Sequence, residues 1–287
     1  MNKHMNTSDQ YIIKDLVLGK RTEYKRSYSP DLLQAIPRSL NRDKLGLTDS
    51  TLPFSGYDLW NLYEISYLNS KRKPQVAVGY FTVPHSSPFI VESKSLKLYL
   101  NSINFTCFDS IDEVASTIKQ DLSFLLHTDI KVELFGLLEQ QNIKMFDIHH
   151  PNGTCIDGID ISVSDFDYNP NLLIDSTSGT SITEELYSNL MKSNCLVTGQ
   201  PDWGTIYIKY TGNKIAHENL LKYIVSYRNH NEFHEMCVER VFCDLMKFCK
   251  PQKLTVYARY TRRGGIDINP FRSNFEENAP FDRLIRQ

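Results

Sequence analysis

Three kinds of feature are missing from this chain of 287 residues. No stretch approaches the roughly 18 apolar residues needed to span a bilayer, and residues 1–6 are polar, unlike the apolar core of a secretory signal. An excess of charge is also missing, because 32 Lys and Arg residues are balanced by 34 Asp and Glu residues, for a net charge of -2. A balanced charge gives no general affinity for nucleic acid or anionic membranes. We therefore predict a cytoplasmic protein without a membrane or nucleic acid as a direct partner.

Several short motifs are missing as well. No C-x-x-C pair occurs among the six cysteines, which argues against a zinc ribbon or a thioredoxin-like site. No G-x-G-x-x-G follows a predicted strand, so we do not expect a Rossmann domain. Cys237, Cys243 and Cys249 recur every six residues, which separates them by about 240° around a helix. We expect these three to be core or flanking residues, because a free cysteine packs as a small hydrophobe.

The composition that is present is that of a soluble globular protein, with 41% hydrophobic and 23% charged residues. Residues 1–50 are polar and basic with little periodicity, which predicts an arm. Apolar residues spaced by three and four predict a helix over 111–125, and Ser110 before two acids is typical of an N-cap. Another helix is predicted to start near Leu96, and strands are predicted over 57–68, 74–83, 130–137 and 144–148.

The second half of the chain repeats this order at a constant offset. Asn104 corresponds to Asn229, and Phe108 corresponds to Phe233. A self-match of this length indicates duplication of a ββααββ unit. We predict an α+β fold with antiparallel sheets and helices on one face. The predicted division is an arm over 1–50, a first module over 51–155, an acidic, loop-like linker over 156–194 and a second module over 195–287.

Cys195 and Asp202 place a thiol and a carboxyl group close together across one turn, which Gly199, Pro201 and Gly204 favour. A thiolate is a strong nucleophile, and a nearby carboxylic acid can protonate what it attacks. For an isolated cysteine the alternative is a buried thiol at the end of a strand.

Two other constellations have structural alternatives. His230 and His234 are four residues apart and could bind zinc on one helical face, but no third ligand and no H-E-x-x-H order is present. We therefore predict no metal. The stretch Glu92-Ser93-Lys94 is, taken alone, typical of a solvated helix start with a capping serine.

Together, residues 195–204, 92–99 and 233–235 resemble the NADPH-dependent 7-cyano-7-deazaguanine reductases, enzymes of queuosine biosynthesis. The resemblance covers nearly the whole chain from about residue 50. It implies two tandem tunnelling-fold (T-fold) ββααββ modules. Because the signature Glu92-Ser93-Lys94 and Cys195 lie in different halves, the chain resembles the longer, two-module branch of that family.

The resemblance also implies a chemistry and a set of site residues. Cys195 would attack the nitrile to form a thioimide, Asp202 would donate a proton, and His234 would help to move protons. The deazapurine substrate would contact Val91, Glu92, Ser93, Phe233, His234 and Glu235. NADPH would contact Ser93, Lys94, Arg263 and Gly264.

Two alternatives and one assembly remain as hypotheses. A zinc-dependent cyclohydrolase or other pterin-type enzyme of the same fold would contain bound metal, and a non-catalytic purine-binding module would not need Cys195. Unpaired edges of the modules predict a homodimer that completes a barrel.

Overall fold

The computed structural model describes residues 25–48, 50–137, 147–280 and 282–287. They form two compact units. The described part of the first unit is residues 25–48, 60–137 and 263–266, and that of the second unit is residues 50–59, 147–262, 267–280 and 282–287. Residues 1–24 and 49 of the predicted arm, and residues 144–146 of the strand predicted over 144–148, lie outside the described residues.

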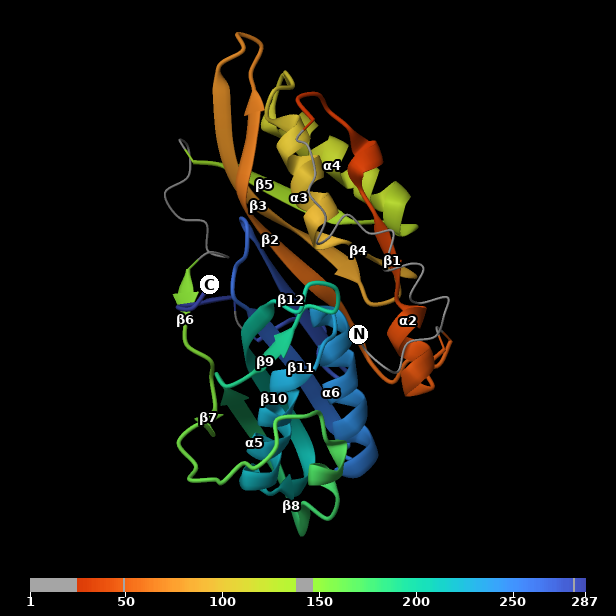
Figure 1. The fold of residues 1–287 in the computed structure, drawn as a ribbon, viewed down its shortest axis with the longest axis vertical. Coiled ribbons are helices and arrows are strands. Elements are labelled where there is room, and N and C mark those ends of the chain that lie inside the picture. The colour runs from red at the N-terminus through yellow and green to blue at the C-terminus, as the bar shows by residue number, and fades with distance from the viewer. Residues whose placement is uncertain (1–24, 49, 138–146, 281) are drawn as a thin grey trace. The chain divides into compact units, whose positions relative to one another are not determined.

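The first unit holds three neighbouring strands in the order β5-β3-β2 and two main helices (Figure 1). Strands β3 and β5 are antiparallel, with Val78 opposite Phe135. The elements are η1 (Pro30–Leu32), β1 (Ala35–Pro37), α2 (Ser39–Arg42), η2 (Asp43–Leu45), β2 (Ser55–Leu68, which starts in the second unit), β3 (Pro74–Pro84), β4 (Phe89–Val91), α3 (Ser93–Ile103), α4 (Ile111–Leu126) and β5 (Lys131–Gly136).

Helix α4 shows why the local sequence folds as predicted. Val114, Ile118 and Leu122 are fully buried at spacings of four, so one stripe of the helix faces the core. Ser110 caps the helix by accepting a hydrogen bond of 3.1 Å from the backbone N–H of Glu113. The predicted helix and its cap are both confirmed.

The second unit is built around the long strand β10, which pairs antiparallel with β8 on one side and β11 on the other. The strand order is β12-β11-β10-β8-β7. The elements are β6 (Ile148–His149), β7 (Thr154–Cys155), η4 (Pro170–Leu173), β8 (Thr177–Ser188), β9 (Lys192–Asn194), β10 (Pro201–Ile215), α5 (His217–Val225), η5 (Ser226–Asn229), α6 (His234–Phe248), β11 (Lys253–Tyr260), β12 (Ile266–Ser273, whose first residue belongs to the first unit) and β13 (Arg283–Leu284).

The core of the second unit combines aromatic residues with a buried ion cluster. Tyr207 lies opposite Tyr257 in the β10–β11 ladder, and both are buried. Arg272 is fully buried and binds Asp58 at 2.8 Å and Glu239 at 2.9 Å. Burial alone would lower the pKa of Arg272, but these two carboxylates raise it, so the guanidinium stays charged.

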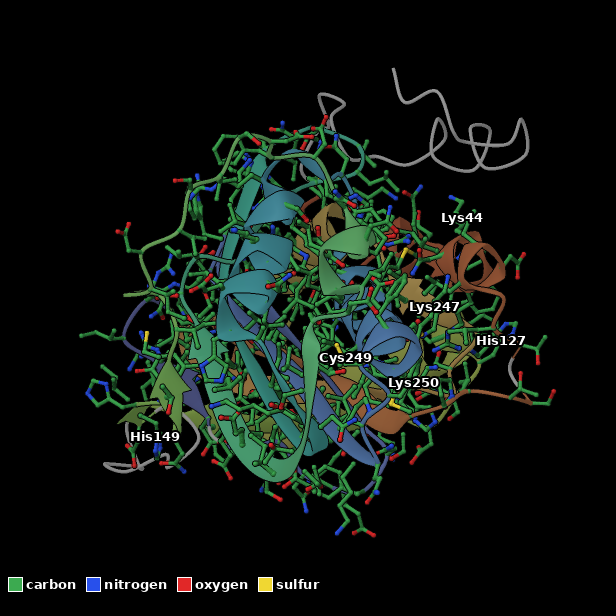
Figure 2. All side chains as sticks on the ribbon, turned by 90° about the horizontal axis from the view of Figure 1, so that it is seen from below. Lys44, His127, His149, Lys247, Cys249 and Lys250 are labelled. Atoms are coloured by element: carbon green, nitrogen blue, oxygen red, sulfur yellow. The ribbon has the colours of Figure 1, made fainter. Side chains whose placement is uncertain are left out.

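Helix α6 ends at Phe248, and Cys249 and Lys250, labelled in Figure 2, lead the chain towards β11. Lys250 has a positive φ of 50°, which reverses the chain after the helix. Cys237 and Cys249 are buried and Cys243 is half-buried, so the prediction of core or flanking thiols is confirmed. All six cysteines are free.

The coarse fold prediction is confirmed, since the structure is α+β and most of its strand pairs are antiparallel. The expectation of a loop-like linker over 156–194 is wrong for part of that range, because residues 177–188 form β8 and 192–194 form β9. Thr, Ser and Ile residues there fit a pleated strand, and β10 supplies the ladder. The division into modules and the T-fold assignment stay predictions. No helix in the described ranges has the length and apolar character needed to cross a membrane.

Candidate active site

Cys195 lies at the start of a tight hairpin loop between β9 and β10. Its backbone N–H donates to the carbonyl of Gln200 at 2.8 Å, and the N–H of Gly199 donates to the carbonyl of Cys195 at 3.0 Å. Gly199 has a φ of 65°, a left-handed conformation that favours glycine. In the paired strands, Asp202 lies opposite Ser193. The thiol of Cys195, which is 5% exposed, therefore lies in a hydrogen-bonded loop. The carboxyl group of Asp202 follows this loop at the start of β10.

The same hairpin is tied to the start of helix α6. The backbone N–H of Asn194 donates to the carbonyl of His230 at 2.8 Å, and the carbonyl of Asn194 accepts from Glu232 at 3.0 Å. Asn194 directly precedes Cys195, and α6 begins at His234. The backbone thus brings the thiol loop next to the helix start that carries Phe233, His234 and Glu235.

Asp202 and His234 form the closest pair of titratable site residues that the sequence predicted. His234 Nε2 lies 3.7 Å from Asp202 Oδ1, and their side chains are 14% and 3% exposed. This distance is within ion-pair range but too long for a hydrogen bond between these two atoms. A carboxyl group and an imidazole this close together, shielded from water, can exchange a proton.

Glu235 lies in the first turn of α6 and is 2% exposed. The helix N-terminus favours a negative charge there. A carboxylate has only acceptor sites, so it suits the N–H groups of a purine-like edge. Phe233, at the N-cap position, is half-buried and presents an aromatic ring beside it. Binding of a base by these two residues stays a prediction.

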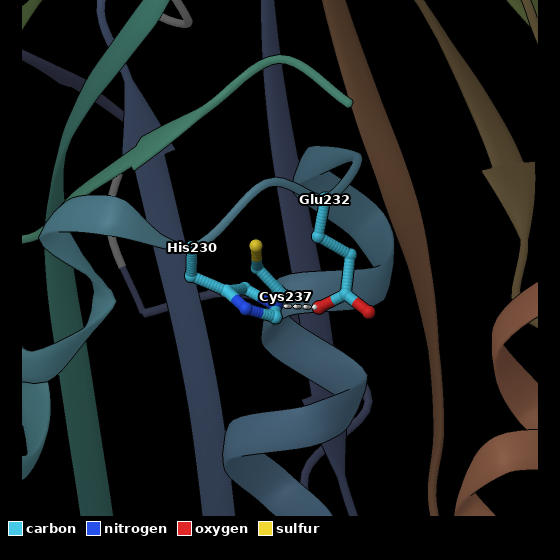
Figure 3. Close-up of side chains that lie close together, drawn as sticks. All are labelled: His230, Glu232 and Cys237. Atoms are coloured by element: carbon cyan, nitrogen blue, oxygen red, sulfur yellow. Dashed lines mark hydrogen bonds and ion pairs between the residues drawn. The ribbon is translucent and has the colours of Figure 1, made fainter. Parts of the chain in front are cut away.

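His230, Glu232 and Cys237 have their ligand atoms within 4.8 Å of one another (Figure 3), which is the geometry of a possible metal site. Their chemistry does not fit a metal, because both oxygens of Glu232 are already engaged. Oε1 accepts from Arg240 Nη2 at 2.6 Å, and Oε2 is 2.9 Å from His230 Nε2. Burial raises the pKa of the Cys237 thiol well above its ordinary value, which disfavours the thiolate that a metal needs.

The two histidines do not share a helical face, as the zinc alternative supposed. Helix α6 begins at His234, so His230 lies before it and the two rings do not share a helical face. His230 instead contacts Glu232, while His234 faces Asp202. The two histidines therefore serve different neighbours.

In the first unit, the predicted signature forms the start of α3. Glu92, rather than a serine, caps this helix, because its carboxylate accepts from the backbone N–H groups of Lys94 at 2.8 Å and Ser95 at 2.7 Å. Glu92 is fully buried, and Val91 before it ends strand β4. Burial raises the pKa of Glu92, although the two N–H groups and the charges of Lys97 and Lys94 act to lower it.

A cavity of about 720 Å³ lies within the first unit beside α3. It is lined by the side chains of Lys94 and Lys97 and by the turn Gly264-Gly265. Both glycines have positive φ angles, 56° and 74°. A Cβ atom at Gly264 would lie 3.2 Å from Lys97 Cε, so the turn needs glycine to run this close to the lysine.

This cavity suits an anionic ligand. Two ammonium groups and a glycine turn, whose backbone a ligand can approach closely, are the components of phosphate sites. Arg263 begins the turn, with its N–H donating to the carbonyl of Ile266 at 2.9 Å. The lining also includes Glu64, whose carboxyl carbon lies where a side chain on Gly265 would be.

The structure therefore brings the predicted residues together in two groups. Cys195, Asp202 and residues 233–235 belong to the second unit, whereas residues 91–94, 263 and 264 belong to the first. Sequence reasoning missed Tyr260, which packs against His234, and gave no role to Glu64. The only sequence signal for Tyr260 is Gly204, the small residue that faces it across the ladder.

Comparison with known proteins identifies the class of this site. Residues 24–134 match a family model described as nitrile reductase, 7-cyano-7-deazaguanine-reductase N-term, and residues 201–279 match one described as QueF-like protein. The first match includes the start of α3, and the second includes Asp202 and His234. The protein is thus an oxidoreductase of the nitrile reductase class.

Within that class, the chain belongs to the 7-cyano-7-deazaguanine reductase family, and its function is the reduction of that compound in queuosine biosynthesis. Among solved structures it is similar to the archaeosine synthase QueF-Like in its apo form, at 16% identity and a TM-score of 0.30. That similarity covers 35% of this chain and 99% of the other.

Proposed function

We propose that the chain reduces the nitrile of 7-cyano-7-deazaguanine to an aminomethyl group through a thioimide on Cys195. A nitrile alone is a poor hydride acceptor. Addition of the Cys195 sulfur to the nitrile carbon forms the S–C bond, while Asp202 gives its proton to the nitrile nitrogen. The observation that carries this proposal is the β9–β10 hairpin, which holds a buried thiol beside an acid whose partner is His234 at 3.7 Å.

His234 supports the proposed proton transfers. Asp202 must be reprotonated after each donation, and an imidazole in ion-pair range can return a proton to it. Later, the C–S bond breaks and the sulfur leaves as a thiolate. The burial of Cys195 and Asp202 keeps water from the reactive carbon, which matters because a free imine is hydrolysed.

The deazapurine is held, in this proposal, by acceptors and an aromatic ring. Glu235 and Glu92 accept hydrogen bonds from the ring N–H and amino groups, and Phe233 packs on the ring face. Val91 and Ser93, on either side of Glu92, complete the contacts. Support comes from the burial of both carboxylates, 2% exposed for Glu235 and 0% for Glu92, since a hydrogen bond to a carboxylate is stronger away from water.

We further propose that NADPH is the reducing cofactor and that two molecules each supply one hydride. The cavity of the first unit fits its phosphates, since it offers Lys94 and the Gly264 turn. Ser93 and Arg263 would add a hydroxyl donor and a guanidinium that can bind phosphate through two hydrogen bonds. These residues bind and orient the anion, while the residues of the second unit move protons.

The proposal includes a cytoplasmic homodimer that does not bind nucleic acid directly. The net charge of -2 supports the absence of nonspecific nucleic acid binding. Sedimentation of the purified protein tests the homodimer, and sedimentation with a tRNA tests the absence of direct nucleic acid binding.

The decisive experiment mixes the protein with 7-cyano-7-deazaguanine, omits NADPH and looks for a covalent adduct by mass spectrometry. We expect one adduct in the natural protein and none in Cys195→Ala. The matched control is Cys249→Ala, because Cys249 is 4% exposed, close to the 5% of Cys195, but lies at the C-cap of helix α6. It should form the adduct normally. Turnover above a trace rate in Cys195→Ala would show that covalent catalysis at this residue is wrong.

A further inference from the structure

Tyr260 packs against the imidazole of the Asp202–His234 pair. It is the last residue of β11 and is fully buried. Its ring centroid lies 4.1 Å from that of His234, with the two ring planes at 85°. Such an edge-to-face contact between aromatic rings is attractive and fixes their mutual orientation.

The ring of Tyr260 is itself held against the strand that carries Asp202. Gly204 faces Tyr260 in the β10–β11 ladder, and a Cβ atom there would lie 3.2 Å from Tyr260 Cδ1. Because Gly204 has no side chain, the ring can lie flat on the backbone two residues after Asp202. The ring is thus confined between strand β10 and the imidazole.

The hydroxyl end of Tyr260 lies among groups of the same site. Burial first, and then the charges of Cys237 and Asp202, raise the pKa of the phenol well above its ordinary value, so the group is neutral. The Ser193 side chain acts in the opposite direction and lowers the pKa of the phenol. Ser193 is 1% exposed and lies opposite Asp202 in the β9–β10 ladder.

The ring contact of Tyr260 bears on the orientation of the His234 imidazole relative to Asp202. At 3.7 Å, no direct hydrogen bond between Nε2 and Oδ1 fixes the angle of the imidazole relative to Asp202. His234 is also the first residue of α6, and its side chain rotates about two bonds. Proton transfer depends steeply on such geometry, because donor and acceptor must come within hydrogen-bond reach.

We propose that Tyr260 is a positioning residue, whose ring holds the His234 imidazole with Nε2 towards Asp202. The inference rests on the proposed roles of Asp202 and His234 in proton transfer. It adds a residue that touches neither the substrate nor the cofactor and that acts through the imidazole.

The test compares Tyr260→Leu, which removes the ring, with Tyr260→Phe, which keeps it. The measurements are the rate of adduct formation without NADPH and the Kd of the deazapurine in a Cys195→Ala background. We expect Tyr260→Leu to slow adduct formation by at least ~10-fold while Kd changes less than ~3-fold, since proton transfer by a placed side chain contributes about 10²- to 10⁴-fold. Tyr260→Phe should restore the rate to within ~3-fold, because the ring contact remains.

Tyr257→Leu is the matched control. Tyr257 is buried on the same strand, but its ring packs on Phe271 at 6.1 Å instead of on His234. Both leucine variants should lose stability, and only Tyr260→Leu should lose the chemical step. If Tyr260→Leu does not fold, Gly204→Ala replaces it, because the added Cβ pushes the ring without removing it. It should slow adduct formation in the same way.

A double-mutant cycle separates positioning from general damage. In a His234→Ala background, Tyr260→Leu should cause no further loss of rate beyond about twofold, because the imidazole that it positions is gone. Full additivity of the two losses would overturn the inference, and so would a Tyr260→Phe variant as slow as Tyr260→Leu. If instead His234→Ala and Asp202→Asn both leave adduct formation unchanged, the proposed proton roles fail, and this inference fails with them.

Discussion

Asp202 and Glu232 are buried acids of the second unit that face different partners. Glu232 binds the guanidinium of Arg240, which cannot lose its proton at physiological pH, so that contact is a permanent ion pair. Asp202 faces the imidazole of His234, which can gain or lose a proton near neutral pH. A buried carboxyl group therefore suits a structural role at Glu232 and proton transfer at Asp202.

The Asp202→Asn variant tests the second role. An amide cannot donate a proton to the nitrile nitrogen, so we expect kcat to fall by roughly 10²- to 10⁴-fold. Affinity for the deazapurine, measured in the absence of NADPH, should change little, since asparagine keeps the shape. An unchanged kcat would remove Asp202 from the mechanism.

Glu232→Gln tests the structural role. Burial alone would raise the pKa of Glu232, but hydrogen bonds from His230 and Arg240 and the charge of Arg240 lower it to about 2. The stability from this ion pair is therefore present above the ordinary pKa near 4.5 and is lost as pH falls towards 2. Because the change leaves Arg240 buried without its charged partner, we expect a loss of up to about 3–5 kcal/mol at pH 7.

Urea denaturation at pH 7 and pH 3 measures this loss, and the difference between the two proteins should be smaller at pH 3. The control is Glu133→Gln, since the side chains of Glu133 and its partner Lys131 are largely exposed to solvent and their ion pair should contribute at most ~1 kcal/mol. A loss for Glu232→Gln that is equal at both pH values would contradict the assignment.

At the scale of elements, the start of α3 joins capping to a buried charge. Glu92 satisfies two N–H groups of the helix, yet burial raises the pKa of its carboxyl group. The folded protein therefore holds a proton on Glu92 more readily than the unfolded chain does, and stability falls as pH rises from the ordinary range towards the folded pKa. A neutral residue would cap with less loss, so an acid at this position supports a binding role.

Glu92→Gln checks this argument in two measurements. Its free energy of unfolding should fall less than that of the natural protein as the pH is raised from 4 to 7, because glutamine stays neutral. Affinity for the deazapurine at pH 7 should fall about 10-fold, or ~1.4 kcal/mol, since a charged acceptor is lost. Affinity equal to that of the natural protein would limit Glu92 to the helix cap.

Elements were predictable where the signal is local. The apolar spacing over 111–125 and the cap at Ser110 define α4 without help from the rest of the chain. Strand β8 was missed because Thr and Ser residues are also typical of loops, and it exists through pairing with β10. The contact of His230 with Glu232 was not predictable, because it depends on how the segment folds back on Asn194.

At the scale of the whole molecule, the two proposed roles belong to different units. The anion cavity with Lys94 and Gly264 lies within the first unit, and Cys195 and Asp202 belong to the second. Lys94→Ala and Arg263→Ala should therefore weaken the use of NADPH and leave adduct formation without NADPH nearly unchanged. Each lost charge-assisted phosphate contact is worth about 1.5–3 kcal/mol, or roughly 10- to 150-fold in the KM for NADPH.

Lys119→Ala is the control, because Lys119 lies on α4 in the same unit and pairs with Asp129 instead of lining the cavity. It should behave as the natural protein in both assays. Equal losses of adduct yield and NADPH use in Lys94→Ala would mean that Lys94 shapes more than cofactor binding, and the assignment would be withdrawn.

Part of the candidate site could be predicted from short motifs, because Cys195, Asp202 and residues 233–235 lie in short segments with distinctive sequences. The residues that pack around these motifs could not be predicted. Tyr260 meets His234 only because α6 packs against β11, and Lys97 meets Gly264 although they are far apart in the chain. Contacts between distant segments arise from tertiary packing, which leaves no local pattern.

Among the described residues, the β9–β10 hairpin that carries Cys195 has no counterpart in the first unit. There, β2 and β3 are joined by residues 69–73, closed by a hydrogen bond of 3.0 Å from Asn69 N–H to the Lys73 carbonyl. In the second unit the equivalent connection, residues 189–200, adds β9 and the thiol loop. If the halves share an ancestor, this connection has changed in length in one of them while the strands on either side stayed paired. The proposed nucleophile would then lie in a part of the chain that can be exchanged without loss of the sheet.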